Sequence, residues 1–137
     1  MSTSENRRII ENVFAENAKG NGQPFFETLA DDVQWTIIGT TAWSKTHVGK
    51  AAIVSDLVAP LGAQLAPPMI VRAHRIHADG DFVIVEGKGA NKTRNGTPYE
   101  NTYCWVIRMQ DGRMAEVTEY ADTQLIATAL SPPGAPA

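Results

Sequence analysis

Glu119, Tyr103 and Asn101 are the residues whose types and spacing best suit acid–base chemistry. Every second side chain of a β-strand lies on the same face of the sheet. Tyr103 and Asn101 therefore share one face of a strand, and Glu119 shares a face of another strand with Val117 and Ala121. Among apolar walls, burial would raise the pKa of a glutamate, so that it could exchange a proton near neutral pH. The tyrosine and the amide could then donate hydrogen bonds to a carbonyl or a developing enolate oxygen.

Each of these residues also has a purely structural interpretation. Glu119 would be an ordinary strand carboxylate if it were exposed or paired with a lysine or arginine, and a β-bulge would reverse its face. Tyr103 would be a core aromatic with a satisfied hydroxyl, and Asn101 would tie its strand to a loop. The sequence alone leaves both interpretations open.

Four long strands joined by tight turns must position these side chains. The turns are predicted by dipeptides that tolerate positive φ angles, which are Asp79-Gly80, Asn95-Gly96 and Asp111-Gly112. The segments between them are rich in Val, Ile, Tyr, Trp and Thr, which favour strands. The predicted strands cover residues 69–78, 81–93, 97–110 and 113–122. A strand of about 13 residues would run roughly 40 Å if straight, so we expect this sheet to twist and curl, with bulges and a concave face.

The rest of the chain supplies helices and one further strand. Apolar residues at helical spacing predict helices over residues 4–19, 24–29 and 50–61, with a short C-terminal helix capped by Asp122. Alternation predicts a strand over residues 33–37, followed by a loop over 39–49. Helices followed by antiparallel strands predict an α+β fold. We expect a single domain over residues 1–130 and a disordered tail over 131–137.

Composition excludes several classes of function. The net charge of −3 and the pI near 5.5 argue against nucleic-acid binding. No apolar run is long enough to span a membrane, and the polar start of the chain does not predict a signal peptide. A single cysteine excludes an intrachain disulfide. We therefore expect a cytoplasmic protein with neither a nucleic-acid nor a membrane partner.

Five stretches together resemble a known superfamily. They are LADDVQW at 29–35, HVGKAAI at 47–53, DGDFVIVE at 79–86, YENTYCW at 99–105 and DGRMAEVTEYADT at 111–123. The chain resembles the superfamily of nuclear transport factor 2, ketosteroid isomerases, limonene epoxide hydrolases and SnoaL-like polyketide cyclases, and it looks most like the SnoaL-like branch. This resemblance implies a cone-shaped, curled antiparallel sheet, made of the four-strand meander plus a short first strand and wrapped on three N-terminal helices. It also implies that the faces carrying Glu119 and Tyr103 look into the concave side.

The resemblance carries over one catalytic position. Glu119 corresponds to a pocket aspartate of the limonene epoxide hydrolases. The positions of the ketosteroid isomerase acids hold Ile37, Ile38 and Trp105 here, and those of the epoxide hydrolase arginine–aspartate pair hold Gly87 and Gly89.

The remaining candidate residues would form the walls of a small-molecule pocket. Gly87 and Gly89 would leave room for a ligand, Trp43 would be an exposed loop residue at the mouth, and His47 would be a loop histidine able to act as a second acid or base. His74 and His77 would lie on opposite faces of a strand, so we expect no metal site. The predicted substrate-binding residues are Trp35, Ile37, Trp43, His47, Val85, Gly87, Trp105, Val117 and Ala121.

The sequence therefore predicts a small-molecule pocket protein. We expect a cofactor-independent isomerase, cyclase or hydrolase that uses Glu119, with Tyr103 and Asn101, on a small apolar carbonyl-bearing substrate. The alternatives are a non-catalytic binding protein for a small apolar ligand and a dimeric protein-interaction module. The mixed apolar and charged character of the convex sheet face predicts a homodimer.

Overall fold

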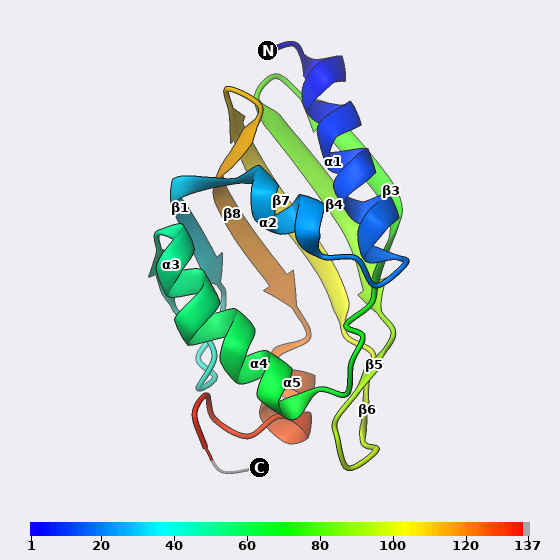
Figure 1. Ribbon diagram of the computed structural model, residues 1–137, viewed down its shortest axis with the longest axis vertical. Helices are drawn as coiled ribbons and strands as arrows, with labels where there is room; N and C mark the ends of the chain where they lie inside the picture. The colour runs from blue at the N-terminus through cyan, green and yellow to red at the C-terminus, as the bar shows by residue number, and fades with distance from the viewer. Residues whose placement is uncertain (136–137) are drawn as a thin grey trace.

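The computed structural model describes residues 1–135 and confirms the α+β fold, with the helices of residues 3–64 packed on one side of a curled sheet and the C-terminal helix at its lower end (Figure 1). None of its helices is long and apolar enough to cross a membrane. The elements are α1 (Thr3–Asn17), α2 (Gln23–Thr28), β1 (Leu29–Ile37), β2 (Thr46–Val48), α3 (Lys50–Ile53), η1 (Val54–Val58), α4 (Ala59–Gln64), β3 (Val71–Asp79), β4 (Phe82–Gly89), β5 (Asn91–Lys92), β6 (Pro98–Tyr99), β7 (Thr102–Gln110), β8 (Arg113–Ala121) and α5 (Thr123–Ala129).

The main sheet has six strands in the order β2-β1-β8-β7-β4-β3. Strands β3, β4, β7 and β8 form the predicted antiparallel meander, whose hairpins turn at glycines with positive φ. Strand β1 joins β8 in parallel. Strand β2 lies within the segment that we predicted to be a loop. The prediction missed this strand because three residues, Thr46-His-Val, are too few to show strand periodicity.

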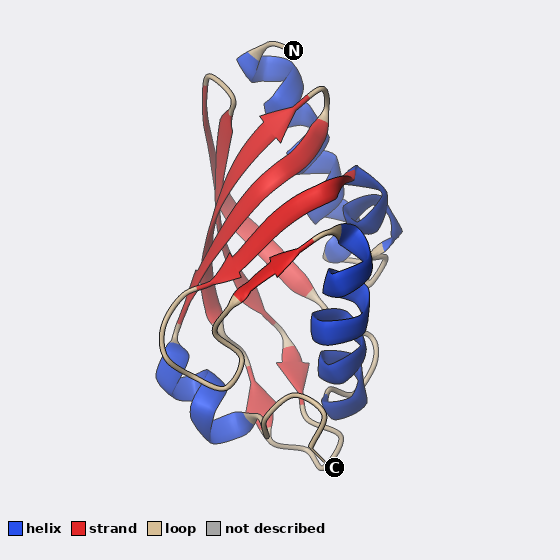
Figure 2. Ribbon diagram, turned by 90° about the vertical axis from the view of Figure 1, so that its left-hand side faces the viewer, coloured by secondary structure: helices blue, strands red, loops and turns tan. Residues whose placement is uncertain are grey.

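The two longest predicted strands are interrupted. The second ends at Gly89 and the third begins at Thr102, while residues beyond these points pair as the separate ribbon β5–β6. At the break, the N–H of Ala90 donates to the carbonyl of Ile70 and the N–H of Gly89 donates to that of Asn101. The break and three shifts of register let the sheet curl around the helices, as Figure 2 shows.

The helices begin and end for local reasons. Ser2 and Glu5 form a capping box at α1, and the carboxylate of Asp122 accepts from two N–H groups at the start of α5. The predicted helix 50–61 continues to Gln64 as α3, η1 and α4, with a π-helical turn in the middle. Pro60 lacks an N–H and crowds the preceding turn, and the wider turn accommodates it.

Two apolar clusters fill the interior. The larger lies between the sheet and helices α1–α3 and includes Trp35 and Trp105. The smaller, called the lower cluster here, closes the end of the sheet near α5 and consists of Trp43, Leu65, Tyr99, Ile126 and Leu130. Leu57 packs against both clusters, and the candidate acid–base residues lie where they meet.

Candidate functional site

Glu119 lies inside the molecule, on the face of β8 that looks toward the helices. It is paired with Trp105 on β7 and with Ile37 on β1, and both of these neighbours are buried. Protein atoms surround the carboxylate densely, yet the residue keeps some solvent-accessible surface. The carboxylate itself is thus packed among apolar side chains.

Two indole groups approach this carboxylate. Nε1 of Trp105 donates to Oε1 of Glu119 at 2.9 Å. Nε1 of Trp35 also approaches the carboxylate, but it makes no well-formed hydrogen bond. Burial raises the pKa of Glu119 above its ordinary value, and the two indole contacts oppose that effect only in part. No ion pair in the described residues involves Glu119.

Aromatic rings form the walls of this site. Tyr103 stacks on Trp105 with ring centroids 4.5 Å apart, and Phe14 of α1 covers Trp105 at 5.3 Å. Phe25 of α2 meets Trp35 edge-on at 5.4 Å. Helices α1 and α2 thereby fix the rings whose N–H groups point at Glu119. We call Glu119, Trp35, Trp105 and Tyr103 the Glu119 site.

Tyr103 and Asn101 differ in how free their polar groups are. Tyr103 is half-buried, and burial raises the pKa of its hydroxyl well above the ordinary value. Asn101 is fully buried, and its amide bonds to protein on every side. Its Oδ1 accepts from the N–H of Asp122 at 3.0 Å, and its Nδ2 donates to the Asp122 carbonyl at 3.3 Å and to the Tyr99 hydroxyl at 3.1 Å. Asn101 thus ties β7 to the start of α5, which is the structural alternative given above.

Comparison with known proteins identifies the family. The SnoaL-like domain family matches residues 10–117. The chain belongs to the SnoaL-like family. The match ends just before Glu119, so membership supports the fold without assigning a role to that residue.

Solved structures agree with this fold. An NTF2-like protein of Burkholderia xenovorans is 24% identical over 96% of this chain and 99% of its own, with a TM-score of 0.73. One of Burkholderia thailandensis is 22% identical over 96% and 100% of the two chains, with a TM-score of 0.79. An LEH-like epoxide hydrolase of M. tuberculosis is 22% identical over 89% and 86%, with a TM-score of 0.70. No curated protein sequence matches the chain.

The glycines of β4 do not leave space in this SnoaL-like chain, contrary to our expectation. A Cβ atom on Gly87 would lie 2.8 Å from the carbonyl oxygen of Arg72 and 3.2 Å from the ring of Trp105. A Cβ atom on Gly89 would lie 3.1 Å from Nδ2 of Asn91 and 3.5 Å from the ring of Tyr103. The glycines let the backbone and these rings approach closely, so the room that they provide is already filled.

His47 lies inside the protein rather than in a solvated loop. It occupies β2, pairs with Trp35 and is only 4% exposed. Burial lowers the pKa of its imidazole, Lys45 adds to this effect and Asp56 opposes it. Its Nδ1 has no hydrogen-bond partner in the described residues. Hydrophobic alternation in Thr46-His-Val gave no signal for this placement, since the apolar residue, Val48, is 62% exposed.

Trp43 is also buried, which corrects our prediction of an exposed residue at the mouth. It is 5% exposed and belongs to the lower cluster. Its Nε1 donates to the carbonyl of Ser131 at 2.9 Å, and Gln64 bonds to both the N–H and the carbonyl of the same residue. The first residue of the predicted tail is therefore held against the domain, whereas residues 136–137 lie outside the described residues. The other predicted wall residues face the interior, with Ile37, Val85 and Val117 buried and Ala121 half-buried.

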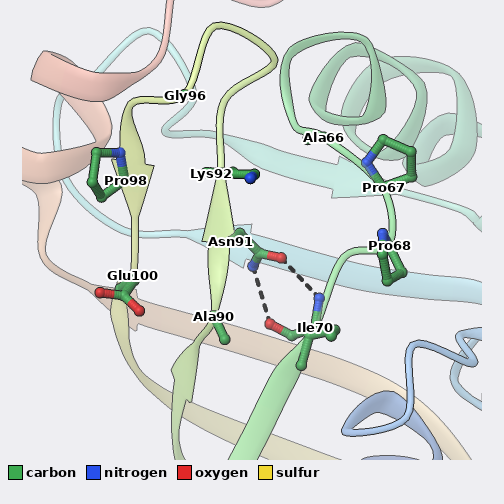
Figure 3. A pocket seen from close by; sticks show the side chains of 10 residues that line it. All are labelled: Ala66, Pro67, Pro68, Ile70, Ala90, Asn91, Lys92, Gly96, Pro98 and Glu100. Atoms are coloured by element: carbon green, nitrogen blue, oxygen red, sulfur yellow. Dashed lines mark hydrogen bonds between the residues drawn. The ribbon is translucent and has the colours of Figure 1, made fainter.

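Two surface hollows lie apart from the carboxylate of Glu119. The first, of about 470 Å³, lies between the α4–β3 loop and the β5–β6 ribbon (Figure 3). Asn91 joins the two sides of its floor through hydrogen bonds to the N–H and carbonyl of Ile70, at 2.8 and 3.1 Å. These bonds satisfy the only buried polar side chain of its lining, and the charged side chains of the lining, Lys92 and Glu100, are exposed.

The second hollow, of about 460 Å³, lies on the convex face of the sheet and includes His74 and His77. We predicted opposite faces for these histidines, but the register shift between Ala73 and Arg75 brings them to the same face. His77 bonds to Glu86 at 2.8 Å. No group of three metal-binding side chains forms here or elsewhere in residues 1–135.

Proposed function

We propose that this protein is a small-molecule enzyme in which Glu119 transfers a proton to and from a small, mostly apolar, carbonyl-bearing substrate. The observation that carries this proposal is a carboxylate buried among aromatic walls with no cationic partner in the described residues. Perturbed carboxylates in such surroundings are typical of acid–base sites. The epoxide hydrolase among the similar structures is consistent with a pocket enzyme of this fold.

The proposed mechanism needs no cofactor. Trp105 fixes one carboxylate oxygen by its hydrogen bond, so the other can take a proton from the carbon next to the substrate carbonyl. The electron pair of the broken C–H bond moves into the carbonyl, whose oxygen becomes an enolate oxygen. The Tyr103 hydroxyl stabilises the developing negative charge. The proton then returns from Glu119 to the same or another carbon.

Deuterium exchange tests the proton transfer before the substrate is known. A panel of small cyclic ketones and enones is incubated in D₂O with the protein, and the loss of α-protons is followed by NMR. We expect the wild type to accelerate exchange for at least one compound and Glu119→Gln to abolish this. Because burial raises the pKa of Glu119, the rate should increase as the pH rises through that raised pKa and level off above it.

Glu116→Gln is the matched control, since Glu116 lies on the same strand but is exposed and bonded to Arg108 at 2.9 Å. It should exchange ketone protons at the wild-type rate. Equal rates for Glu119→Gln and the wild type would exclude Glu119 as the acid–base group.

A non-catalytic ligand carrier is the second candidate, and one observation favours it. The pKa of Glu119 is shifted by burial and by two indole groups, with no second carboxylate or imidazole of the described residues among these causes, and the positions of the ketosteroid isomerase acids hold Ile37, Ile38 and Trp105. Native mass spectrometry of the purified protein distinguishes the two. A bound, unmodified small molecule together with no exchange activity would favour the carrier.

A further inference from the structure

We propose that residues 122–131 form a strap that closes the entrance to the Glu119 site. The strap consists of Asp122, helix α5, Leu130 and Ser131. It lies across the lower end of the sheet, where β8 ends (Figure 1). The proposal rests on the proposed function for what passes beneath the strap, whereas the opening of the strap is a property of the fold alone.

The strap begins next to the Glu119 site. On β8, Glu119 and Ala121 occupy successive inward positions, opposite Trp105 and Tyr103, and are roughly 7 Å apart. Ala121 packs against the lower cluster, and Asp122 follows it directly. The lower cluster, to which the strap contributes, therefore covers the end of the sheet immediately beside the carboxylate.

A carboxamide side chain holds each end of the strap. At its start, Asn101 accepts from the N–H of Asp122 at 3.0 Å and donates to its carbonyl at 3.3 Å. At its end, Gln64 accepts from the N–H of Ser131 at 2.9 Å and donates to its carbonyl at 3.0 Å. Nε1 of Trp43 donates to the same carbonyl at 2.9 Å. We call the hydrogen bonds of Ser131 the latch.

The two ends of the strap differ in their exposure to water. Asn101 is fully buried, so water cannot readily replace its bonds to Asp122. Ser131 is exposed and Gln64 is half-buried, so water can replace the bonds of the latch at a small net cost. The latch should therefore open first, while Asp122 stays attached and acts as the hinge.

The far end of the strap has little else to hold it. It is followed by exposed residues, 132–134. Helix α2 and the helical segment 50–64 run instead into the buried residues Leu29 and Leu65, so they cannot swing away without moving the rest of the fold. Neither surface hollow includes Glu119, so a ligand needs an opening of this kind to reach it.

Helix α1 is the alternative cover that could open, and it buries more apolar surface. It places three buried apolar side chains in the larger cluster, Ile10, Val13 and Phe14. Among residues 122–131 only Ile126 and Leu130 are buried. The apolar surface that is exposed sets much of the cost of opening, and the segments that open locally are those that bury least. The strap should therefore open more often than α1.

Hydrogen exchange followed by NMR tests the strap without a ligand. The N–H of Leu130, bonded to the carbonyl of Ile126 at 3.1 Å, reports opening of the strap. The indole N–H of Trp105, bonded to Glu119, reports the entry of solvent into the site. We expect Gln64→Ala to speed the exchange of both about tenfold, because it removes two bonds of the latch. Gln64→Glu, which keeps the size but cannot donate to Ser131, should act in the same direction.

Ser2→Ala is the matched control. It removes the capping bonds of α1 at a similar cost but leaves the latch intact, so neither exchange rate should change. If the indole N–H of Trp105 responded to Ser2→Ala as strongly as to Gln64→Ala, entry through α1 or global unfolding would replace the strap. Faster exchange at Leu130 without faster exchange at Trp105 would also overturn the proposal, as would no change at either.

The kinetics of 2-naphthol, a small fluorescent phenol, test the passage of a ligand. Stopped-flow fluorescence measures its association and dissociation with the wild type and with Gln64→Ala. We expect both rate constants to rise by the same factor, about tenfold, and Kd to stay unchanged, because a gate affects passage in both directions. A change in Kd would indicate an altered site instead of a gate, and no binding to either protein would overturn the strap as an entrance.

These outcomes are distinct from those of the proposed function. A strap that opens as described, together with no exchange of ketone protons, would exclude Glu119 as a base and leave the strap in place. Ketone exchange that depends on Glu119, together with no response of Trp105 or 2-naphthol to Gln64→Ala, would overturn the strap and leave the base.

Discussion

At the scale of single residues, Trp105 and Trp35 approach the same carboxylate but have different hydrogen-bonding states. The N–H of Trp105 makes a short hydrogen bond to Glu119, whereas the N–H of Trp35 has no well-formed bond. Both rings are almost fully buried in the same cluster. Replacing either by phenylalanine removes one N–H and a similar volume, so the difference between the two variants isolates the hydrogen bond.

We predict that Trp105→Phe destabilises the fold by about 1–3 kcal/mol more than Trp35→Phe, because only the first leaves Glu119 without its donor. Urea unfolding of both variants at one pH measures this difference. The loss of the donor should also raise the pKa of Glu119 further in Trp105→Phe. Equal stabilities would show that the hydrogen bond contributes nothing.

At the scale of elements, the close contacts of β4 suggest a second test. Gly87 lets the backbone of β3 and the ring of Trp105 approach β4, and any side chain there would meet both. We predict that Gly87→Ala costs about 1–3 kcal/mol, as other overpacked positions do. Gly62 in α4 is the matched control, since nothing lies within 4 Å of a Cβ placed there. Gly62→Ala should stabilise the protein by about 0.5–1 kcal/mol through helix propensity, as thermal unfolding would show. A destabilisation of the same size in both variants would contradict this account.

The elements also show what the sequence could predict. The glycine turns and the alternation of β-branched and aromatic residues were sufficient to predict the meander, because turn chemistry and side-chain period act locally. The break at Ala90, the pairing of β2 with β1 and the bulge near Ala73 were not predictable, because each depends on contacts between distant segments. The bulge alone changed the assignment of His74 and His77 to faces of the sheet.

The candidate site was predictable to a similar extent. Alternation sorted Glu119, Tyr103 and Trp105 into faces of their strands, the resemblance implied that these faces look inward, and the structure brings the residues together. Alternation could not reveal that Asn101 is bonded entirely within the protein, or that Tyr99 receives one of those bonds. Hydrogen-bond partners depend on side-chain orientations that sequence spacing does not determine.

At the scale of the whole molecule, we propose that the convex face forms a homodimer interface. Phe82 and Tyr120 are 43% and 46% exposed, and Ile84, Cys104 and Val106 are half-buried beside the second surface hollow. A partly apolar sheet face of this kind is typical of an interface. Sedimentation at micromolar concentration should give the mass of a dimer, and a monomeric mass would contradict the proposal.

An interface variant tests where the dimer forms. Tyr120→Arg places a charge on the convex face and should shift the protein to a monomer. Phe26→Arg is the control, because Phe26 is similarly exposed but lies on α2, on the helical side of the sheet (Figure 2). A monomer from Phe26→Arg and a dimer from Tyr120→Arg would place the interface on the other side.

The ionisation of Glu119 tests the central claim most directly. NMR titration of protein labelled with ¹³C at the glutamate carboxyl groups follows each of them, and the resonance absent from Glu119→Gln identifies this one. We predict that Glu119 titrates clearly above the ordinary glutamate value of 4.5, because burial disfavours its charged form. We also predict that 2-naphthol shifts its resonance while the exposed Glu116 does not respond. A pKa at or below the ordinary value, with no response to the probe, would contradict the account of Glu119 as the acid–base group of a ligand site.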